Sequence, residues 1–165
     1  MLRMTAPWLD SMTPIGPPNA ATPTMKNLMY AAVLTGRWSG IICLIVYLIG
    51  RLAGVPFEVA NSRDSAPAVI PWLVVLLVPL VVAVLGTLLA SLARGQRAAG
   101  RIVFWAGTLI ALLSCLMPIM QPSGVLWSTR ILLLVMHAIT WALVVPQIAR
   151  IVGDSEPGFH VDRND

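Results

Sequence analysis

Residues 71–92 form one apolar run, PWLVVLLVPLVVAVLGTLLASL, that contains no charged residue. Roughly 20 apolar residues are enough for an α-helix to cross a bilayer, so a run of this length is typical of a transmembrane helix. Only 11% of the 165 residues are charged and 58% are apolar, whereas a soluble domain has about 25% charged residues. This composition excludes disorder for most of the chain and predicts an integral membrane protein.

Three further apolar stretches accompany this run. We predict spans at about 36–54, 70–92, 102–120 and 131–148, and therefore an all-α fold, an integral membrane four-helix bundle within residues 29–150. A flexible, Pro-rich cytoplasmic tail is expected over 1–28, with Met12 and Met25 as alternative translation starts, and a polar, acidic cytoplasmic tail over 151–165.

Small residues indicate where the helices approach one another. The first span contains Gly36-x-x-x-Gly40 and Gly50-x-x-x-Gly54, a spacing that allows close contact between helix backbones. A similar stripe in the second span consists of Gly86, Thr87, Ala90 and Ser91. The connection of ten residues between the third and fourth spans predicts that these two helices are antiparallel neighbours.

The basic residues predict the orientation. Eight of them fall on one side of the predicted spans: Arg3, Lys26, Arg37, Arg94, Arg97, Arg101, Arg150 and Arg163. Three fall on the other side, namely Arg51, Arg63 and Arg130. The positive-inside rule then places both termini in the cytoplasm and the chain in the cytoplasmic membrane. The arginines form no basic face, which argues against binding of nucleic acid.

Three stretches together resemble a known family: LIVYLIGRLAGVPFEV at 44–59, ALLSCLMPIM at 111–120 and LLLVMHAITWALVVPQI at 132–148. They are similar to small four-span membrane proteins from actinobacteria that are classified only as a domain of unknown function. The matching positions are Arg51, Gly54, Ser114, Pro118, Met136 and His137, over about residues 36–149. Cys115 stands where the family pattern has leucine. The resemblance implies the four-span fold and transfers no activity.

Catalytic motifs are missing from the sequence. All seven carboxylates lie outside the predicted spans, and no HExxH, GxGxxG, P-loop or nucleophile-elbow pattern occurs. We therefore expect no enzyme and no cofactor, and an activity on a lipid or a quinone is the remaining enzymatic alternative. Cys43 and Cys115 lack ligand spacing, so no metal site is expected; their different depths in the membrane also argue against a disulfide between them.

His137 is the one ionisable side chain inside the fourth predicted span, and such groups are costly in a membrane. Its depth matches that of Ser114 in the third span, which makes Ser114 and His137 a candidate intramembrane polar pair. Thr140 and Trp141 follow His137 by one turn on the same helix face, and Arg51 is a further candidate. His137 is interpreted either as a structural hydrogen-bonding residue or as a proton-linked or ligand-binding one.

These features favour a structural or accessory membrane protein that interacts with the lipid bilayer, with other membrane proteins or with itself. The alternative is a small oligomeric carrier or channel-like protein in which His137 and Arg51 line a polar path. Ion-coupled carriers usually place an acid or a broken helix at the bilayer midplane, and neither is visible here.

Overall fold

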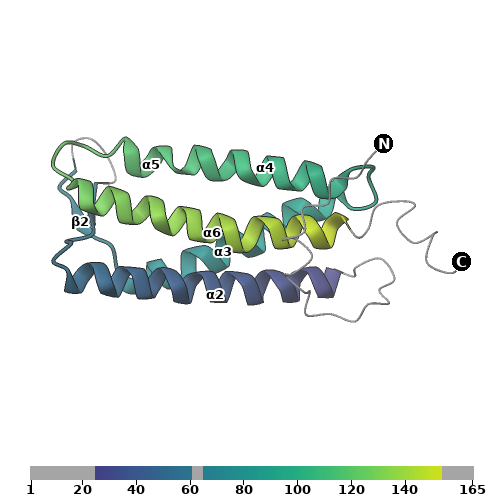
Figure 1. The fold of residues 1–165 in the computed structure, drawn as a ribbon, viewed down its shortest axis with the longest axis horizontal. Coiled ribbons are helices and arrows are strands. Elements are labelled where there is room, and N and C mark those ends of the chain that lie inside the picture. Colours follow the sequence, from purple (N-terminus) through teal and green to yellow (C-terminus); the bar gives the residue numbers. More distant parts are fainter. Residues whose placement is uncertain (1–24, 61–64, 154–165) are drawn as a thin grey trace, which may run out of the picture.

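The structure, a computed structural model, describes residues 25–60 and 65–153. Its main elements are four long helical segments that lie side by side (Figure 1). In chain order the elements are α2 (Met25–Leu52), β1 (Glu58–Val59), β2 (Ala68–Val69), α3 (Trp72–Ala90), the short 3₁₀ helix η1 (Ser91–Ala93), α4 (Ala99–Ser114), α5 (Leu116–Ile119) and α6 (Trp127–Gly153).

All four helical segments are long and apolar enough to cross a membrane. This confirms the predicted all-α four-helix bundle. Two helices are longer than the spans predicted for them. α2 begins at Met25 rather than near residue 36, so residues 25–28 form its first turn instead of part of a tail. α6 runs from Trp127 to Gly153, beyond the predicted 131–148. The remainder of both predicted tails lies outside the described residues.

The third predicted span is not one continuous helix. α4 ends at Ser114, Cys115 forms a turn, and the single-turn helix α5 follows. Pro118 explains the interruption, because it has no N–H to donate to the carbonyl of Ser114 four residues earlier. The amide of Cys115 still forms the regular helical hydrogen bond to the Ala111 carbonyl oxygen at 3.1 Å, and it also lies 3.2 Å from that of Leu112.

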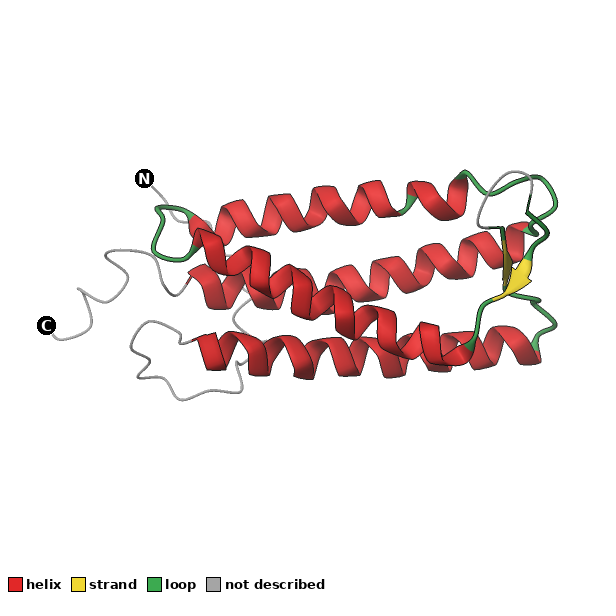
Figure 2. Ribbon diagram, turned by 180° about the vertical axis from the view of Figure 1, so that it is seen from behind, coloured by secondary structure: helices red, strands yellow, loops and turns green. Residues whose placement is uncertain are grey.

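The helices do not pack in the order of the sequence. α3 packs on α2, α2 on α6, and α6 on α4. The contact between α4 and α6 agrees with the prediction that the third and fourth spans are neighbours. In contrast, α3 and α4 hardly touch, although a short turn joins them. Figure 2 shows the reason, since α3 crosses the molecule at an angle to the other three helices. One side of the bundle between α3 and α4 is therefore not closed by a helix contact.

Glycines allow the close contact between α2 and α3. A Cβ atom at Gly36 would lie 2.8 Å from Ala83 Cβ, and one at Gly40 would collide with the carbonyl oxygen of Leu76. The predicted Gly36–Gly40 contact motif is confirmed. Gly50 and Gly54 act differently: Gly50 packs against Phe57 and Leu132, while Gly54 has a φ of +84° in the turn after α2.

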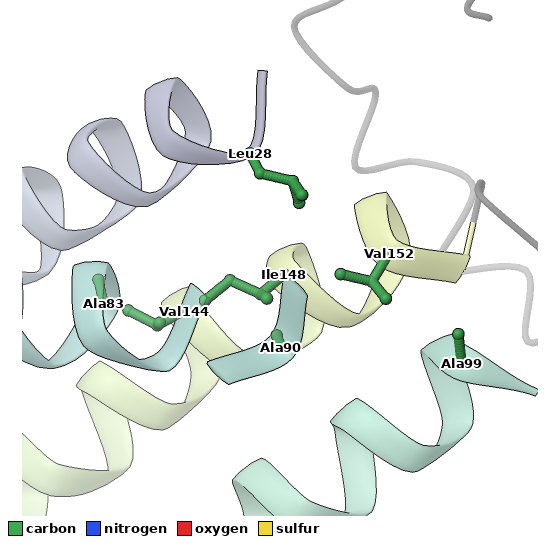
Figure 3. Close-up of a cluster of buried hydrophobic side chains, with 7 residues drawn as sticks. All are labelled: Leu28, Ala83, Ala90, Ala99, Val144, Ile148 and Val152. Atoms are coloured by element: carbon green, nitrogen blue, oxygen red, sulfur yellow. The ribbon is translucent and has the colours of Figure 1, made fainter. Parts of the chain in front are cut away.

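Two apolar clusters hold the ends of the bundle together. The cluster in Figure 3 consists of Leu28, Ala83, Ala90, Ala99, Val144, Ile148 and Val152. It joins the start of α2, the end of α3, the start of α4 and the end of α6, so these four helix termini lie at the same end of the molecule. We call this the α3–α4 turn end.

The second cluster lies toward the opposite end, where β1 and β2 form a short antiparallel ribbon in which Glu58 faces Val69. Its buried members are Cys43, Tyr47, Phe57, Val75 and Met136. The Tyr47 hydroxyl donates a hydrogen bond to the Ile70 carbonyl at 2.9 Å, and its ring lies 4.6 Å from that of Phe57. This cluster anchors the ribbon to the helices; we call this the ribbon end.

Candidate functional site

The unclosed side of the bundle contains a cavity of about 520 Å³. α3 and α4 form its two walls and α6 its floor, with Cys43 of α2 at one edge. Along α6 the lining extends from Leu133 to Ile148. Most lining residues are aliphatic, and the polar ones, apart from Cys43, are Ser114, His137, Thr140 and Trp141. Cavities of this size and composition are typical of sites for small apolar molecules.

The predicted polar pair lies on this cavity, but its members do not bond to each other. Ser114 Oγ donates a hydrogen bond to the Ala111 carbonyl at 2.7 Å, and His137 Nδ1 lies 2.8 Å from the Leu133 carbonyl oxygen. Ser114 and His137, the candidate polar pair, thus both line the cavity but are not hydrogen-bonded to each other. Each side chain is satisfied by a carbonyl of its own helix, three or four residues earlier.

The contact of His137 with a carbonyl oxygen makes Nδ1 a donor. A carbonyl oxygen can only accept, so the hydrogen of this bond lies on Nδ1. Among the described residues, none donates a hydrogen bond to Nε2. The ring also borders a second hollow of about 330 Å³ between α4 and α6, so it stands between two spaces.

Thr140 joins α6 to α2. Its hydroxyl donates to the Met136 carbonyl at 2.9 Å and accepts a hydrogen bond from Ser39 Oγ at 3.1 Å. Ser39 is fully buried, and the thiol of Cys43 lies 3.6 Å from the same Met136 carbonyl oxygen. These contacts satisfy polar groups of two helices inside the bundle. Cys43 and Cys115 are both free thiols.

Trp141 joins α6 to α4. Its indole Nε1 donates to Thr108 Oγ1 at 3.0 Å, and Thr108 donates in turn to the Phe104 carbonyl at 2.8 Å. The ring of Phe104 lies 6.3 Å from that of Trp141. Trp141 therefore fixes one wall of the cavity, and it has no polar atom left to offer a ligand.

Arg51 lies away from the cavity. Its side chain is exposed, and Nη1 donates to the Pro56 carbonyl at 2.9 Å, which ties the end of α2 to the following loop. The structure therefore does not bring Arg51 and His137 together on one path. Among the described residues, no group of three His, Cys, Asp or Glu side chains could hold a metal ion.

Sequence reasoning missed Arg130, which is only 7% exposed. Its guanidinium donates to the carbonyls of Val125, Ile119 and Pro122 at 3.3, 3.1 and 2.7 Å. It also lies 4.7 Å from the centre of the Trp127 ring. An arginine in the first turn of an apolar helix, three residues after a tryptophan, is the signal that could have indicated this role.

Comparison with known proteins gives a family but no activity. The model of a family of unknown function matches residues 23–154, most of the chain. The chain belongs to the DUF6069 family. This match confirms the inferred membership in a family without an assigned function and extends beyond the 36–149 expected from the motifs. The actinobacterial origin inferred for this family stays a prediction. No curated protein and no solved structure matches the chain significantly.

Proposed function

We propose that this chain is a non-catalytic accessory protein of the cytoplasmic membrane, with both termini in the cytoplasm, that binds another membrane component on its open side between α3 and α4. The observation that carries the proposal is that α3 and α4 hardly touch, which leaves the cavity beside α6. The component is a lipid, another membrane protein or a second copy of the chain.

The polar groups support a binding role rather than a catalytic one. The hydroxyl and indole hydrogens that face the cavity are donated within the bundle, by Ser114, Thr140 and Trp141. Among the residues that the structure describes, the lining contains no carboxylate and no second imidazole to act with His137. General acid–base chemistry requires a proton donor or acceptor positioned on the substrate. Here that group would be His137, with no carboxylate or second imidazole of the described lining to orient it.

The alternative, a small oligomeric carrier or channel around His137, has less support. A path for ions or protons requires polar side chains along its length. Beyond Trp141 the lining of α6 consists of Val144, Val145 and Ile148, and none of these can exchange hydrogen bonds with a polar solute.

Gly86 provides the variant that tests the proposal. It lines the cavity, and a Cβ atom built there has no neighbour within 4 Å, so a side chain can begin there without a collision. Gly86→Leu fills part of the cavity. Gly86→Ala controls for the gain in helix propensity, and Ala142→Leu adds bulk at an exposed position of α6 outside the cavity.

The experiment is purification of the four proteins in a mild detergent, followed by native mass measurement. We expect the wild-type protein, Gly86→Ala and Ala142→Leu to retain a component in stoichiometric amount, and Gly86→Leu to lose it. Retention of the same component by Gly86→Leu, or a bare wild-type protein, would overturn the proposal.

A further inference from the structure

Arg37 is a charged residue in the middle of an otherwise apolar helix. The span predicted at about 36–54 puts it at the membrane boundary, but α2 runs from Met25 to Leu52, so Arg37 lies twelve residues from one end and fifteen from the other. At about 1.5 Å per residue these separations are about 18 and 22 Å. A long side chain reaches the membrane surface from a position near a helix end, and Arg37 is near neither end.

The contacts between α2 and α3 fix the height of Arg37 in the bundle. Leu28 lies with Ala90 in the cluster at one end of α3. The Tyr47 hydroxyl bonds to the Ile70 carbonyl, just before the other end. Arg37 is nine residues from Leu28 and ten from Tyr47, so it lies level with the middle of α3. Because the uncharged α3 is long enough to fill the hydrocarbon core of a bilayer, this height corresponds to the midplane.

The guanidinium of Arg37 has no partner in the described part of the chain. The residue is exposed, it does not line the cavity, and no hydrogen bond, ion pair or aromatic ring of the described residues holds it. Glu58 on β1 is the only carboxylate among the described residues, and it lies at the ribbon end. A charge at the centre of a bilayer is costly unless it is paired or faces water. The group that neutralises Arg37 in a membrane therefore comes from elsewhere.

The surface around Arg37 has the form of a helix contact. Tyr30, Val33, Ile45 and Leu48 are exposed apolar residues of α2 that share one side of the helix with Arg37. We call these five residues the α2 outer face. From residue 30 to residue 48 this face is about 27 Å long at about 1.5 Å per residue, which is close to the thickness of the hydrocarbon core, about 30 Å. A transmembrane helix can therefore lie along its full length.

A second copy of this chain cannot supply the opposite charge. None of the carboxylates of the sequence belongs to the four membrane-spanning helices: they are Asp10, Glu58, Asp64, Asp154, Glu156, Asp162 and Asp165. Because these residues flank the helices in the sequence, a neighbouring copy in either orientation presents none of them from a helix at mid-depth. The carboxylate has to be carried by a helix of a different protein.

We propose that the α2 outer face binds a transmembrane helix of another protein that carries an Asp or Glu at mid-depth, and that Arg37 pairs with this carboxylate. Arginine suits the role because its planar guanidinium can bind a carboxylate through two parallel hydrogen bonds. The proposal adds a second contact surface to the proposed accessory function. It does not depend on the open side between α3 and α4, since no residue of the α2 outer face lines the cavity.

The test uses the full-length protein, with a donor fluorophore at its carboxyl terminus, in phosphatidylcholine vesicles. Two transmembrane peptides of about 21 residues, rich in leucine and alanine, carry an acceptor fluorophore and differ only at the central position, which is Asp or Leu. Energy transfer measures association. A hydrogen bond between charged groups is worth about a ten- to hundredfold difference in affinity. The Asp peptide should therefore bind more tightly than the Leu peptide by about this factor.

Four variants assign this preference to its residue. Arg37→Leu and Arg37→Gln remove the charge and should abolish the preference for Asp, whereas Arg37→Lys keeps the charge and should retain most of it. Arg51→Leu is the matched control, because Arg51 is an exposed cation at the end of the same helix. It should bind the peptides as the wild-type protein does. Thermal unfolding shows whether each variant is folded; if Arg37→Leu is not, Arg37→Gln gives the same readout.

Photo-crosslinking in native membranes tests the proposal on the natural partner. The crosslinking amino acid replaces Trp38, which is exposed beside Arg37, and in the control it replaces Trp105, an exposed tryptophan of α4. We expect the first position alone to give an adduct with a protein whose transmembrane helix contains Asp or Glu, and Arg37→Leu to remove this adduct. Exchange of the charges, with Arg37→Asp and an arginine in place of the partner's carboxylate, should restore it.

Three results would overturn the proposal. Equal binding of the Asp and Leu peptides would mean that water and lipid phosphate neutralise Arg37. A preference for Asp that persists in both uncharged variants would locate the contact elsewhere. The third result is an adduct between two copies of the chain, or none at all, from the position of Trp38. Gly86→Leu separates this inference from the open side, because it should leave the peptide preference unchanged whether or not it loses the component bound in the cavity.

Discussion

Arg130 holds the turn between α5 and α6 with a charge that lies inside the protein. Its guanidinium serves three carbonyl oxygens, of Ile119, Pro122 and Val125, that would otherwise lose their donors. Hydrogen bonds from charged groups are worth about 1.5–3 kcal/mol each, and we expect Arg130→Met to lower the free energy of unfolding by about 2–4 kcal/mol. Arg130→Lys should recover only part of this loss, because an ammonium lacks the planar fork.

The measurement for Arg130 is denaturant unfolding in detergent, with Arg51→Met as the matched control. Arg51 is exposed and donates to one carbonyl, that of Pro56. Surface substitutions usually change stability by less than about 0.5 kcal/mol, so the control should stay near the wild-type value. Equal losses in the two variants would show that the buried contacts of Arg130 contribute nothing beyond those of an exposed arginine.

Thr87 presents the opposite situation, a buried hydroxyl without a partner. The residue is 0% exposed, and within the described part of the chain its Oγ1 forms no hydrogen bond. Because valine has nearly the same shape and no polar atom to leave unsatisfied, Thr87→Val should raise the free energy of unfolding by about 1 kcal/mol. Thr140→Val is the contrasting control, since it removes the bonds to Ser39 and Met136 and should lower stability. A loss of stability in Thr87→Val would contradict the prediction.

The residues of the candidate site show how far sequence reasoning reaches. Counting residues from the predicted span ends gave Ser114 and His137 the same depth, because the rise per residue fixes depth in the membrane. In the structure both residues line one cavity. It could not reveal their partners. Each side chain also has a carbonyl of its own helix within reach, and that local contact is present wherever the neighbouring helix lies.

At the scale of the helices, glycines that look alike in the sequence differ in their surroundings. Gly40 contacts the backbone of α3 at Leu76, whereas Gly86 faces the open cavity. Gly40→Ala should therefore lower the free energy of unfolding by about 1–3 kcal/mol, the usual effect of overpacking. Gly86→Ala should raise it by up to about 1 kcal/mol, because alanine favours the helix. Unfolding of both variants in one detergent checks the contrast, and equal effects would contradict it.

The helices themselves could be predicted because their apolar runs are long enough to span a bilayer. Their lengths could not, since hydropathy measures the membrane-embedded part, and α2 continues as a helix through Arg37 back to Met25. The ribbon also gave no signal, because strands of two residues have no periodicity. Its geometry depends on Phe57, which has a φ of +50° and is fully buried beside Tyr47.

At the scale of the whole molecule, the tilt of α3 decides what the bundle can do. Gly36 and Gly40 hold α3 against α2, and the cluster around Ala90 and Ile148 holds its carboxyl end against α6. Once both contacts are formed, α3 cannot also pack along α4. The cavity is therefore a consequence of the two contacts, and no pattern in any single span predicts it.

The arrangement of the ends supports a test of the topology. α2 and α6, at about 42 and 40 Å, are longer than the hydrocarbon core of about 30 Å. Their excess length at the α3–α4 turn end carries Lys26 and Arg150. The turn itself carries Arg94 and Arg97, and Arg101 follows in the first turn of α4. The Arg94 guanidinium reaches Met25 Sδ at 3.9 Å. Among the described residues, the opposite end carries only Arg51 and Arg130 as cations.

This charge distribution predicts that the α3–α4 turn end faces the cytoplasm. A reporter that is active only in the cytoplasm should work when fused after Arg150 and fail when inserted near Ser62; the reverse pattern would contradict the orientation. Replacing Arg94, Arg97 and Arg101 together by glutamine removes the basic residues of the turn while leaving the apolar spans unchanged. If those charges set the orientation, the Arg150 fusion should lose part of its activity and the Ser62 insertion should gain it. Unchanged activities would mean that Lys26 and Arg150 near the helix termini, together with Arg37 within α2, are sufficient.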